Sequence, residues 1–235
     1  MRRLRLLMKR LLPLWLLAWA TIVGTSIAGA SVAWAAGDCG PQACMRAPVD
    51  ITDKASLQRG AGLFMSYCAG CHSARYLRYE RLSRDLDIDP RLVEKYLMFA
   101  GDSLGDPVQP PVSAQDQARW FGNAPPDLTL ATRLHSPDWV YSYLLGFYAD
   151  DSRPWGVNNR VVRDVAMPDA LAPLRAALPP AEFRAQVGDL VNFMAWMADP
   201  TRITRERTGL FVLLFLAILI VPVWLLNREF WKGVK

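Results

Sequence analysis

Hydrophobic and polar positions divide the chain into three kinds of segment. Two long uncharged apolar runs lie near the ends, at residues 11–36 and 209–226, and the part between them alternates short apolar stripes with polar, proline-rich stretches. In that middle part, apolar positions recur at spacings of three and four, which is the period of an amphipathic helix. Alternating patterns typical of strands are sparse. The sequence therefore predicts a mainly helical domain between two apolar ends.

Helices in the middle part are predicted from their apolar stripes and from their starting residues. Proline follows a polar residue at two of the starts, and proline is favoured at the first helical position. Two long stretches, residues 100–135 and 149–180, show no clear element, which in a compact domain indicates function or a bound group. The expected helices are residues 53–67 (with Thr52 as N-cap), 90–100, 136–148 and 181–198.

The N-terminal apolar run has the organisation of a secretory signal peptide. A basic head precedes it, and Ala33, Trp34 and Ala35 provide the small-residue site that a signal peptidase needs. We therefore expect residues 1–35 to direct export across a bacterial membrane and then to be removed. An uncleaved anchor is the alternative, because the run is long enough to span a bilayer. A mitochondrial presequence is disfavoured, since such presequences are amphipathic.

The second apolar run, "GLFVLLFLAILIVPVWLL", predicts a transmembrane helix. Eighteen residues at about 1.5 Å each give roughly 27 Å, close to the hydrocarbon thickness of a bilayer. Basic residues flank the run almost equally, so orientation follows from export of the preceding domain. We expect a single-pass protein of the bacterial inner membrane, with a periplasmic domain at residues 36–207, an anchor at 208–227 and a cytoplasmic tail at 228–235.

The positive charge of the chain is concentrated in its end segments. The whole sequence has 27 Lys and Arg against 22 Asp and Glu, but residues 36–200 carry 16 basic and 20 acidic side chains. Binding of nucleic acid requires a clustered basic face, so we expect no nucleic-acid partner. A mildly acidic domain suits a basic protein partner that is attracted by long-range electrostatics.

The segment "MSYCAGCHSARYL" places Cys68, Cys71 and His72 in a C-x-x-C-H arrangement. Three chemistries share this spacing: a thiol–disulfide redox pair, half of a zinc site, and covalent haem attachment. A redox pair is expected within a βαβ unit, and no strand pattern flanks Cys68. Zinc would need further ligands, and Cys39, Cys44 and His135 are available, but no second C-x-x-C or paired-histidine spacing exists. The motif is most specific for haem, because two thiols reach the vinyl groups and the next imidazole reaches the iron.

A haem attached in this way needs a second axial ligand or an open position. Met167 is the preferred candidate because it lies in the loop "RDVAMPDAL", where Pro168 stiffens the backbone beside it. His135 is the competitor and would give a site of lower reduction potential. A methionine ligand raises the potential and leaves no position for oxygen or a substrate. Electron transfer is therefore expected rather than peroxidase chemistry.

Several segments, taken in order, resemble the cytochrome c1 family in its short proteobacterial form. Each is modest alone, whereas the ordered set within residues 47–235 is specific. The resemblance implies a mainly α fold: a cytochrome c-like haem domain with long loops, plus one C-terminal transmembrane helix. The matching segments are "DKASLQRGAGLFMSYCAGCHSARYLRYERL", "APPDLTLATR", "DWVYSYLLGFY", "RPWGVNN", "VAMPDAL" and the C-terminal anchor.

The resemblance also implies roles for individual residues. Cys68 and Cys71 would bind one haem c through thioethers, with His72 as the proximal iron ligand and Met167 as the distal one. The periplasmic domain, residues 36–207, would thus be a c-type haem domain.

Four further positions match or depart from elements around the haem in the family. Pro125 and Pro126 resemble prolines of the pocket wall. Arg133 matches the first arginine of an Arg-x-Arg element whose members lie near a haem propionate. His135 replaces the second arginine, so this propionate contact is in question.

Of two further pairs of residues, one matches the family and the other does not. Asn158 and Asn159 match an element that precedes the methionine loop, and the sequence supplies no function for them. Cys39 and Cys44 have no counterpart in the resemblance. In an oxidising compartment we expect them to form a small disulfide loop, with two free thiols as the alternative.

The function implied by the resemblance is that of a subunit of the quinol–cytochrome c reductase (cytochrome bc1) complex, which is dimeric. The chain would pass one electron at a time from the Rieske iron–sulfur protein to a cytochrome c, and cytochrome b would hold its anchor. Its side chains would catalyse no reaction themselves. The alternatives are a membrane-anchored electron shuttle, an oxidase-associated cytochrome c, and an exported thiol–disulfide oxidoreductase using Cys68 and Cys71.

Overall fold

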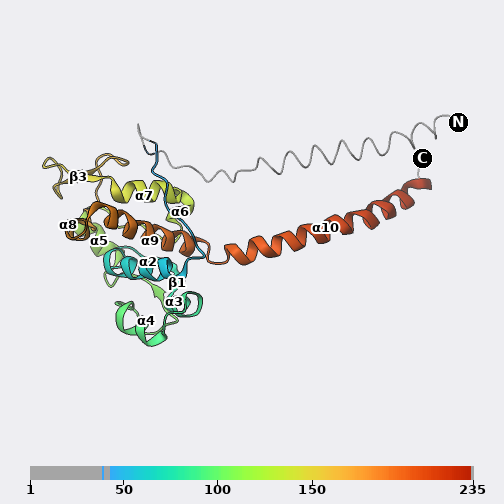
Figure 1. Ribbon diagram of the computed structural model, residues 1–235, viewed down its shortest axis with the longest axis horizontal. Helices are drawn as coiled ribbons and strands as arrows, with labels where there is room; N and C mark the ends of the chain where they lie inside the picture. Colours follow the sequence, from blue (N-terminus) through green and yellow to red (C-terminus); the bar gives the residue numbers. More distant parts are fainter. Residues whose placement is uncertain (1–38, 40–42, 234–235) are drawn as a thin grey trace. The chain divides into compact units, whose positions relative to one another are not determined.

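A computed structural model of the chain describes residue 39 and residues 43–233. The expected signal peptide, residues 1–35, lies outside the described residues, as do the last two residues of the expected tail. The described part is mainly helical, which confirms the fold class expected from the sequence (Figure 1). Its helices are α2 (Lys54–Tyr67), α3 (Tyr79–Leu86), α4 (Pro90–Tyr96), α5 (Ala114–Phe121), α6 (Ala131–Leu134), α7 (Pro137–Leu145), α8 (Ala172–Ala177), α9 (Pro180–Ala198), α10 (Arg202–Phe230) and the short 3-10 helix η1 (Trp231–Gly233).

Two small antiparallel ribbons accompany the helices. One pairs β1 (Ala74–Arg78) with β2 (Pro107–Val108), and the other pairs β3 (Phe147–Ala149) with β4 (Val157–Asn159). β1 follows the Cys68 motif closely, where the sequence showed no strand pattern, and β2, β3 and β4 use segments that the sequence analysis assigned to loops or to a helix end. The second ribbon begins just after α7, and β4 leads into the loop that carries Met167.

The centre of the core is the contact between α2 and α9, which lie side by side in Figure 1. Phe64 of α2 and Phe193 of α9 are fully buried, with ring centroids 5.6 Å apart. Gly60 allows the close approach, because a Cβ at this position would lie 2.7 Å from the Cβ of Phe193 and nearer still to the carbonyl oxygen of Asp189. The two apolar stripes expected from the sequence therefore face each other.

The starts of the four expected helices are confirmed, with one correction. Asp89 accepts a hydrogen bond from the N–H of Arg91 at the start of α4, and Ser136 accepts one from the N–H of Trp139 at the start of α7. The N-cap of α2 is Asp53, not Thr52 as expected. The hydroxyl of Thr52 instead donates to Asp50, which leaves Asp53 to accept from the N–H of Ser56 at 3.0 Å.

Some helix ends and loops differ from the sequence expectations. α4 ends at Tyr96 rather than near residue 100, and α7 ends at Leu145 because Phe147 enters the β3–β4 ribbon. The stretch of residues 100–135, expected to lack structure, contains α5 and α6. His135, which directly precedes the helix expected at residues 136–148, is the residue that ends α6.

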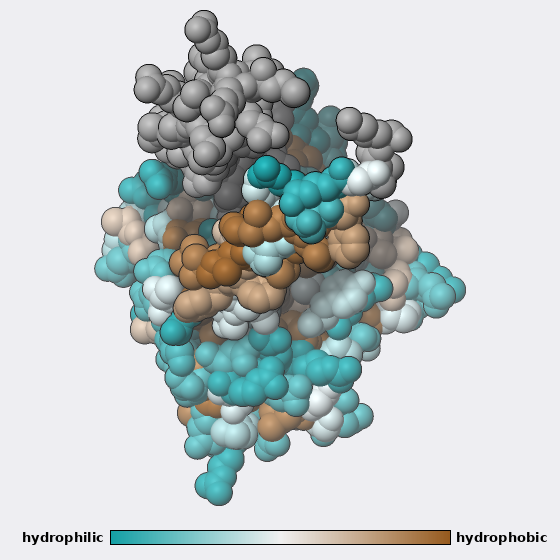
Figure 2. Space-filling model, turned by 90° about the vertical axis from the view of Figure 1, so that its right-hand side faces the viewer, coloured by the Kyte–Doolittle hydropathy of each residue, from teal (hydrophilic) through white to brown (hydrophobic). Residues whose placement is uncertain are grey.

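The C-terminal apolar run forms the greater part of α10, as predicted. The helix also takes in the basic residues that precede the run, and its residues are exposed almost throughout. Among the described residues, α10 is the helix long and apolar enough to span a membrane. The face shown in Figure 2 displays exposed hydrophobic residues as a continuous band beside a largely hydrophilic surface. A helix with this exposure requires a lipid or protein partner along its length.

Candidate functional site

The C-x-x-C-H motif lies at the C-terminal end of α2. Cys68 is the residue that ends the helix, and the N–H groups of Cys71 and His72 both donate to its carbonyl oxygen, at 3.1 and 2.9 Å. This tight turn places the three side chains on one short stretch of backbone. Cys68 is buried and Cys71 is exposed, and both are free thiols.

The ring of His72 is oriented by the backbone of Pro126. Its Nδ1 lies 2.8 Å from the carbonyl oxygen of Pro126. A carbonyl oxygen only accepts, so Nδ1 carries the proton and Nε2 keeps an unshared electron pair. Burial lowers the pKa of His72, and the Pro126 carbonyl and the charge of Asp127 oppose this effect only in part. The neutral imidazole, with its Nε2 available, is the form that binds metals.

The segment around Pro125 and Pro126 is attached to the chain that follows the motif. The N–H of Leu128 donates to the carbonyl of Ser73 at 2.8 Å, and the carboxylate of Asp127 accepts from the hydroxyl of Ser73 at 2.7 Å. Of the two prolines expected in the pocket wall, Pro126 therefore contacts the ring of His72 through its carbonyl, and Pro125 directly precedes it. On the other side of the turn, the amide of Gln117 in α5 donates to the carbonyl of Cys71 at 3.0 Å.

Met167 lies in the loop between β4 and α8, as expected. The hydroxyl of Tyr143, in the last turns of α7, donates to its sulfur at 3.4 Å. Burial raises the pKa of Tyr143 to about 12, and the nearby charge of Asp169 adds to the effect. The hydroxyl is therefore protonated at neutral pH and acts as a donor to the thioether.

The same loop is attached to α7 at two further points. Asn159 donates from its side-chain amide to the carbonyl of Tyr143 at 2.8 Å and accepts from the N–H of Val161 at 2.9 Å. On the far side of Met167, Asp169 forms an ion pair at 3.2 Å with Arg175 of α8, whose guanidinium also donates to the carbonyls of Leu144 and Leu145 at the end of α7. These contacts fix the loop before and after the methionine.

Asn158, whose role the sequence could not supply, organises the turn after β4. Its side-chain oxygen accepts from the N–H of Asp164 at 3.0 Å, and its amide donates to Asp150 at 2.9 Å. The pair of asparagines thus holds the loop that leads to Met167.

Arg133 and His135 occupy different environments. Arg133 is exposed in the last turn of α6. The ring of His135 stacks on Trp139 with centroids 4.2 Å apart, and Trp139 stacks on Tyr143 at 5.3 Å. His135 therefore begins a row of rings that leads through Trp139 to Tyr143, whose hydroxyl is hydrogen-bonded to Met167.

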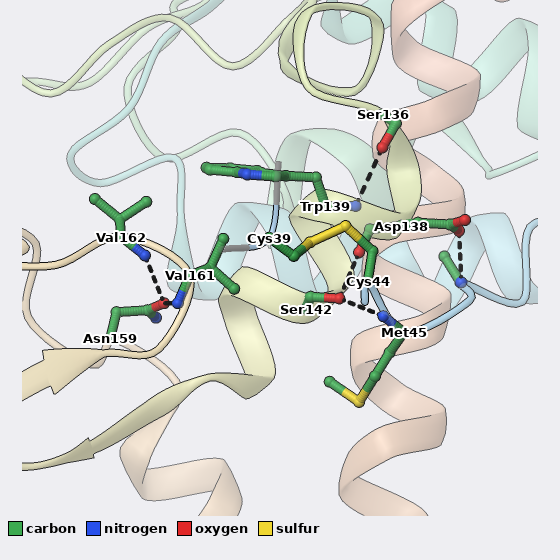
Figure 3. The surroundings of a disulfide bond; sticks show 11 residues. Cys39, Cys44, Met45, Ser136, Asp138, Trp139, Ser142, Asn159, Val161 and Val162 are labelled. Carbon is green, nitrogen blue, oxygen red and sulfur yellow. Dashed lines mark hydrogen bonds between the residues drawn. A yellow bond between two sulfur atoms is a disulfide. The ribbon is translucent and has the colours of Figure 1, made fainter. Parts of the chain in front are cut away.

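Cys39 and Cys44 form a disulfide, which confirms the pairing expected from the sequence (Figure 3). The chain leaving it is bonded to α7, since the N–H of Met45 donates to the hydroxyl of Ser142 at 2.7 Å. A disulfide-bonded cysteine cannot serve as a thiolate ligand. These two cysteines therefore do not complete a zinc site with the C-x-x-C pair.

The remaining donor set fits a c-type haem. Cys68 and Cys71 supply two unpaired thiols, His72 supplies an imidazole nitrogen with a free electron pair, and Met167 supplies a thioether. These are the groups by which a haem is attached and its iron ligated. The contacts form two groups, one around His72 and residues 125–128, the other around Met167 and α7.

Sequence reasoning did not identify Tyr143, Asp127 or Gln117 as members of the site. The spacing of Trp139 and Tyr143, four residues apart, does predict that they share one face of a helix. Nothing local indicates the partner of Tyr143, because Met167 lies 24 residues away along the chain.

Sequence comparisons with known proteins show to which family this chain belongs. The model of the "Cytochrome C1 family" matches residues 45–234. The chain belongs to the cytochrome c1 family. It is 42% identical over 215 residues to "Cytochrome c1" of Allochromatium vinosum, covering 80% of this chain and 88% of that protein. Membership implies a c-type haem.

Other relatives are more distant in sequence or carry a different name. Identity is 28% over 226 residues to "Cytochrome c1" of Rhodospirillum rubrum, covering 78% of this chain and 83% of that protein. It is 34% over 206 residues to a protein of Nitrosomonas europaea named "Ammonia monooxygenase gamma subunit", covering 80% and 88%. The similarity therefore extends to a protein that is named as a subunit of an ammonia monooxygenase.

Proposed function

We propose that this cytochrome c1 family member is the membrane-anchored electron-transfer subunit of a quinol–cytochrome c reductase, with Rieske iron–sulfur protein as donor and a cytochrome c as acceptor. The observation that carries the proposal is the motif at the end of α2, where two free thiols adjoin an imidazole whose Nε2 is kept available by the Pro126 carbonyl. When bound, a haem supplies a one-electron couple.

In this proposal the chain's own residues hold and insulate the group. Cys68 and Cys71 would each hold the haem through a thioether, since a thiol that adds across a vinyl double bond gives its sulfur to one carbon and its proton to the other and requires no oxidant. His72 and Met167 would bind the iron. Pro125 and Pro126 would form part of the pocket wall, and Arg133 would bind near a propionate.

The location proposed for the protein follows from its two ends. Residues 1–35 direct export and are removed, and residues 36–207 form the periplasmic haem domain. Residues 208–227 cross the inner membrane beside cytochrome b, and residues 228–235 remain in the cytoplasm. The exposure of α10 supports a span within the membrane. The complex is expected to be dimeric.

The state of Cys68 argues against a thiol–disulfide oxidoreductase. Burial raises the pKa of Cys68 to about 12, and the neighbouring Cys71 adds to the effect. Redox-active C-x-x-C cysteines have the opposite property, a lowered pKa that maintains a thiolate. A protonated, buried thiol suits permanent attachment instead.

Spectroscopy of the purified full chain tests the ligands. We expect a pyridine haemochrome spectrum with haem retained after denaturation, and a near-infrared sulfur-to-iron charge-transfer band in the oxidised protein. Met167→Leu should keep the covalent haem and lose the band. A chain without covalent haem would contradict the attachment, and a wild type without the band would exclude Met167 as ligand.

Purification from mild detergent tests the partners. Cytochrome b and a Rieske protein should accompany a tagged full-length chain. Recovery with a terminal oxidase, or alone, would favour the oxidase-associated cytochrome or the membrane-anchored shuttle. Recovery with an ammonia-oxidising enzyme would match the name of the Nitrosomonas relative.

A further inference from the structure

The hydrogen bond between Tyr143 and Met167 joins two residues that the sequence places in separate elements. The donor is a phenol on α7, and the acceptor is a thioether sulfur in the loop after β4, at 3.4 Å. A thioether sulfur has two electron pairs and is a weak acceptor. One pair can bind a metal while the other accepts this hydrogen bond, so the contact is compatible with a ligating methionine.

The ring of Tyr143 is held in place by its neighbours. It lies parallel to Trp139, with centroids 5.3 Å apart and an interplanar angle of 4°, and it meets Phe147 edge-on at 5.4 Å. Such aromatic contacts fix both the position and the tilt of a ring. The hydroxyl therefore points at the sulfur because packing directs it there.

The methionine loop is held against the same end of α7 by Arg175. Its guanidinium pairs with Asp169 and also donates to the carbonyls of Leu144 and Leu145, at 3.3 and 3.5 Å. Asn159 bonds the other side of the loop to the carbonyl of Tyr143. The distance between hydroxyl and sulfur is therefore set by contacts on both sides of the pair.

We propose that Tyr143 is a positioning residue for the iron ligand, donating a hydrogen bond to the Met167 sulfur and so raising the reduction potential of the haem. This inference rests on the proposed function, in which Met167 binds iron. A donor on the sulfur withdraws electron density and weakens its donation to iron. The oxidised iron depends more on that donation, so the hydrogen bond favours the reduced state.

The variant Tyr143→Phe tests the inference because it removes the hydroxyl and keeps the ring that stacks on Trp139. Tyr141→Phe is the matched control: it lies on the same helix, and its hydroxyl donates to the carbonyl of Arg184 at 3.2 Å. The measurement is a potentiometric titration of the full chain in its purified complex. We expect Tyr143→Phe to reduce the equilibrium constant for reduction about fivefold, about 40 mV at 59 mV per tenfold. Tyr141→Phe should match the wild type.

A second background shows whether the effect passes through the sulfur. In Met167→Leu, adding Tyr143→Phe should leave the potential unchanged, because the acceptor is absent. An equal shift in this background, or no shift from Tyr143→Phe in the wild type, would overturn the inference.

The charge-transfer band separates this inference from the proposed function. In Tyr143→Phe the band should remain, displaced in wavelength, while in Tyr141→Phe it should not move. An unmoved band in Tyr143→Phe would refute the positioning role while Met167 ligation stands. A wild type that lacks the band would refute Met167 ligation, and the inference would fall with it.

Discussion

A single carboxylate, Asp127, joins the two chain segments that meet beside the attachment motif. One of its oxygens accepts from the Ser73 hydroxyl at 2.7 Å and from the Arg75 N–H at 2.9 Å, and the other accepts from the Thr129 N–H at 2.9 Å. Burial acts to raise the pKa of Asp127, but these hydrogen bonds outweigh it and the pKa is lowered. The charged form is therefore favoured in the folded chain.

Asp127→Asn should destabilise the domain by about 1 kcal/mol at pH 7, because an amide places a donor where the carboxylate had accepted. The folded pKa lies below the unfolded value of about 3.9. The carboxylate's contribution is thus fully present above about pH 4 and is lost as pH falls through the folded pKa. Urea unfolding of the detergent-solubilised full chain at pH 7 measures the difference in the free energy of unfolding between Asp127→Asn and the wild type. The same measurement at lower pH checks that this difference disappears in acid.

Asp151→Asn is the control for this substitution, because Asp151 is an exposed carboxylate. Its unfolding curve should coincide with that of the wild type at pH 7. A stability of Asp127→Asn equal to the wild type at pH 7 would show that the carboxylate does not join the segments.

The grouping of adjacent residues could be predicted at this scale, whereas contacts with distant neighbours could not. Cys68, Cys71 and His72 were expected on one turn from their spacing, and the structure places them there. The haem-binding roles expected for them stay predictions. The cap of α2 shows the limit, because Thr52 and Asp53 both have suitable side chains and backbone geometry selects between them. Nor could the sequence show that Tyr143 meets Met167.

Among the elements, α2 and α9 depend on one glycine for their close contact. Gly60→Ala introduces a methyl group that would meet the backbone of Asp189 and the Cβ of Phe193. Neither atom is the movable end of a side chain, so the helices must separate. We expect a loss of about 1–3 kcal/mol in the free energy of unfolding, the usual cost of overpacking. Urea unfolding followed by tryptophan fluorescence measures it.

Gly62→Ala supplies the matched control on the same helix. A Cβ at this position meets nothing within 4 Å. Alanine favours the helix by up to about 1 kcal/mol over glycine, so this variant should be as stable as the wild type or more so. Equal stabilities for Gly60→Ala and Gly62→Ala would contradict the packing described for α2 and α9.

Long elements with a strong apolar period were predictable, and short elements held by long-range contacts were not. α9 was expected from its stripe to within one residue at its start. α6 has four residues and β2 has two, too few for a period to show. Their existence depends on partners elsewhere, such as the main-chain carbonyl of Met194 in α9, which accepts from Thr132 of α6 at 3.1 Å.

Across the whole molecule, the C-terminal apolar run was recognisable because a bilayer imposes a length and a composition on a segment that spans it, whatever the rest of the fold. α10 meets both conditions, and exposure of its apolar side chains to water would be unfavourable. The rest of the described chain has the opposite organisation, since the candidate site draws on α2, α7, the loop around Pro126 and the loop between β4 and α8. Its location relative to the membrane is therefore best tested on the intact chain.

A specific protease site inserted between Pro200 and Thr201 of the full chain tests this topology. We expect protease added outside spheroplasts to cut there and to release the haem domain into the soluble fraction, because α10 holds it. The same site placed after Lys235 is the control, and it should be cut only in inverted vesicles. Cutting without release would show that residues 1–35 remain as a second anchor. Cutting between Pro200 and Thr201 only in inverted vesicles would place the haem domain in the cytoplasm and contradict the orientation.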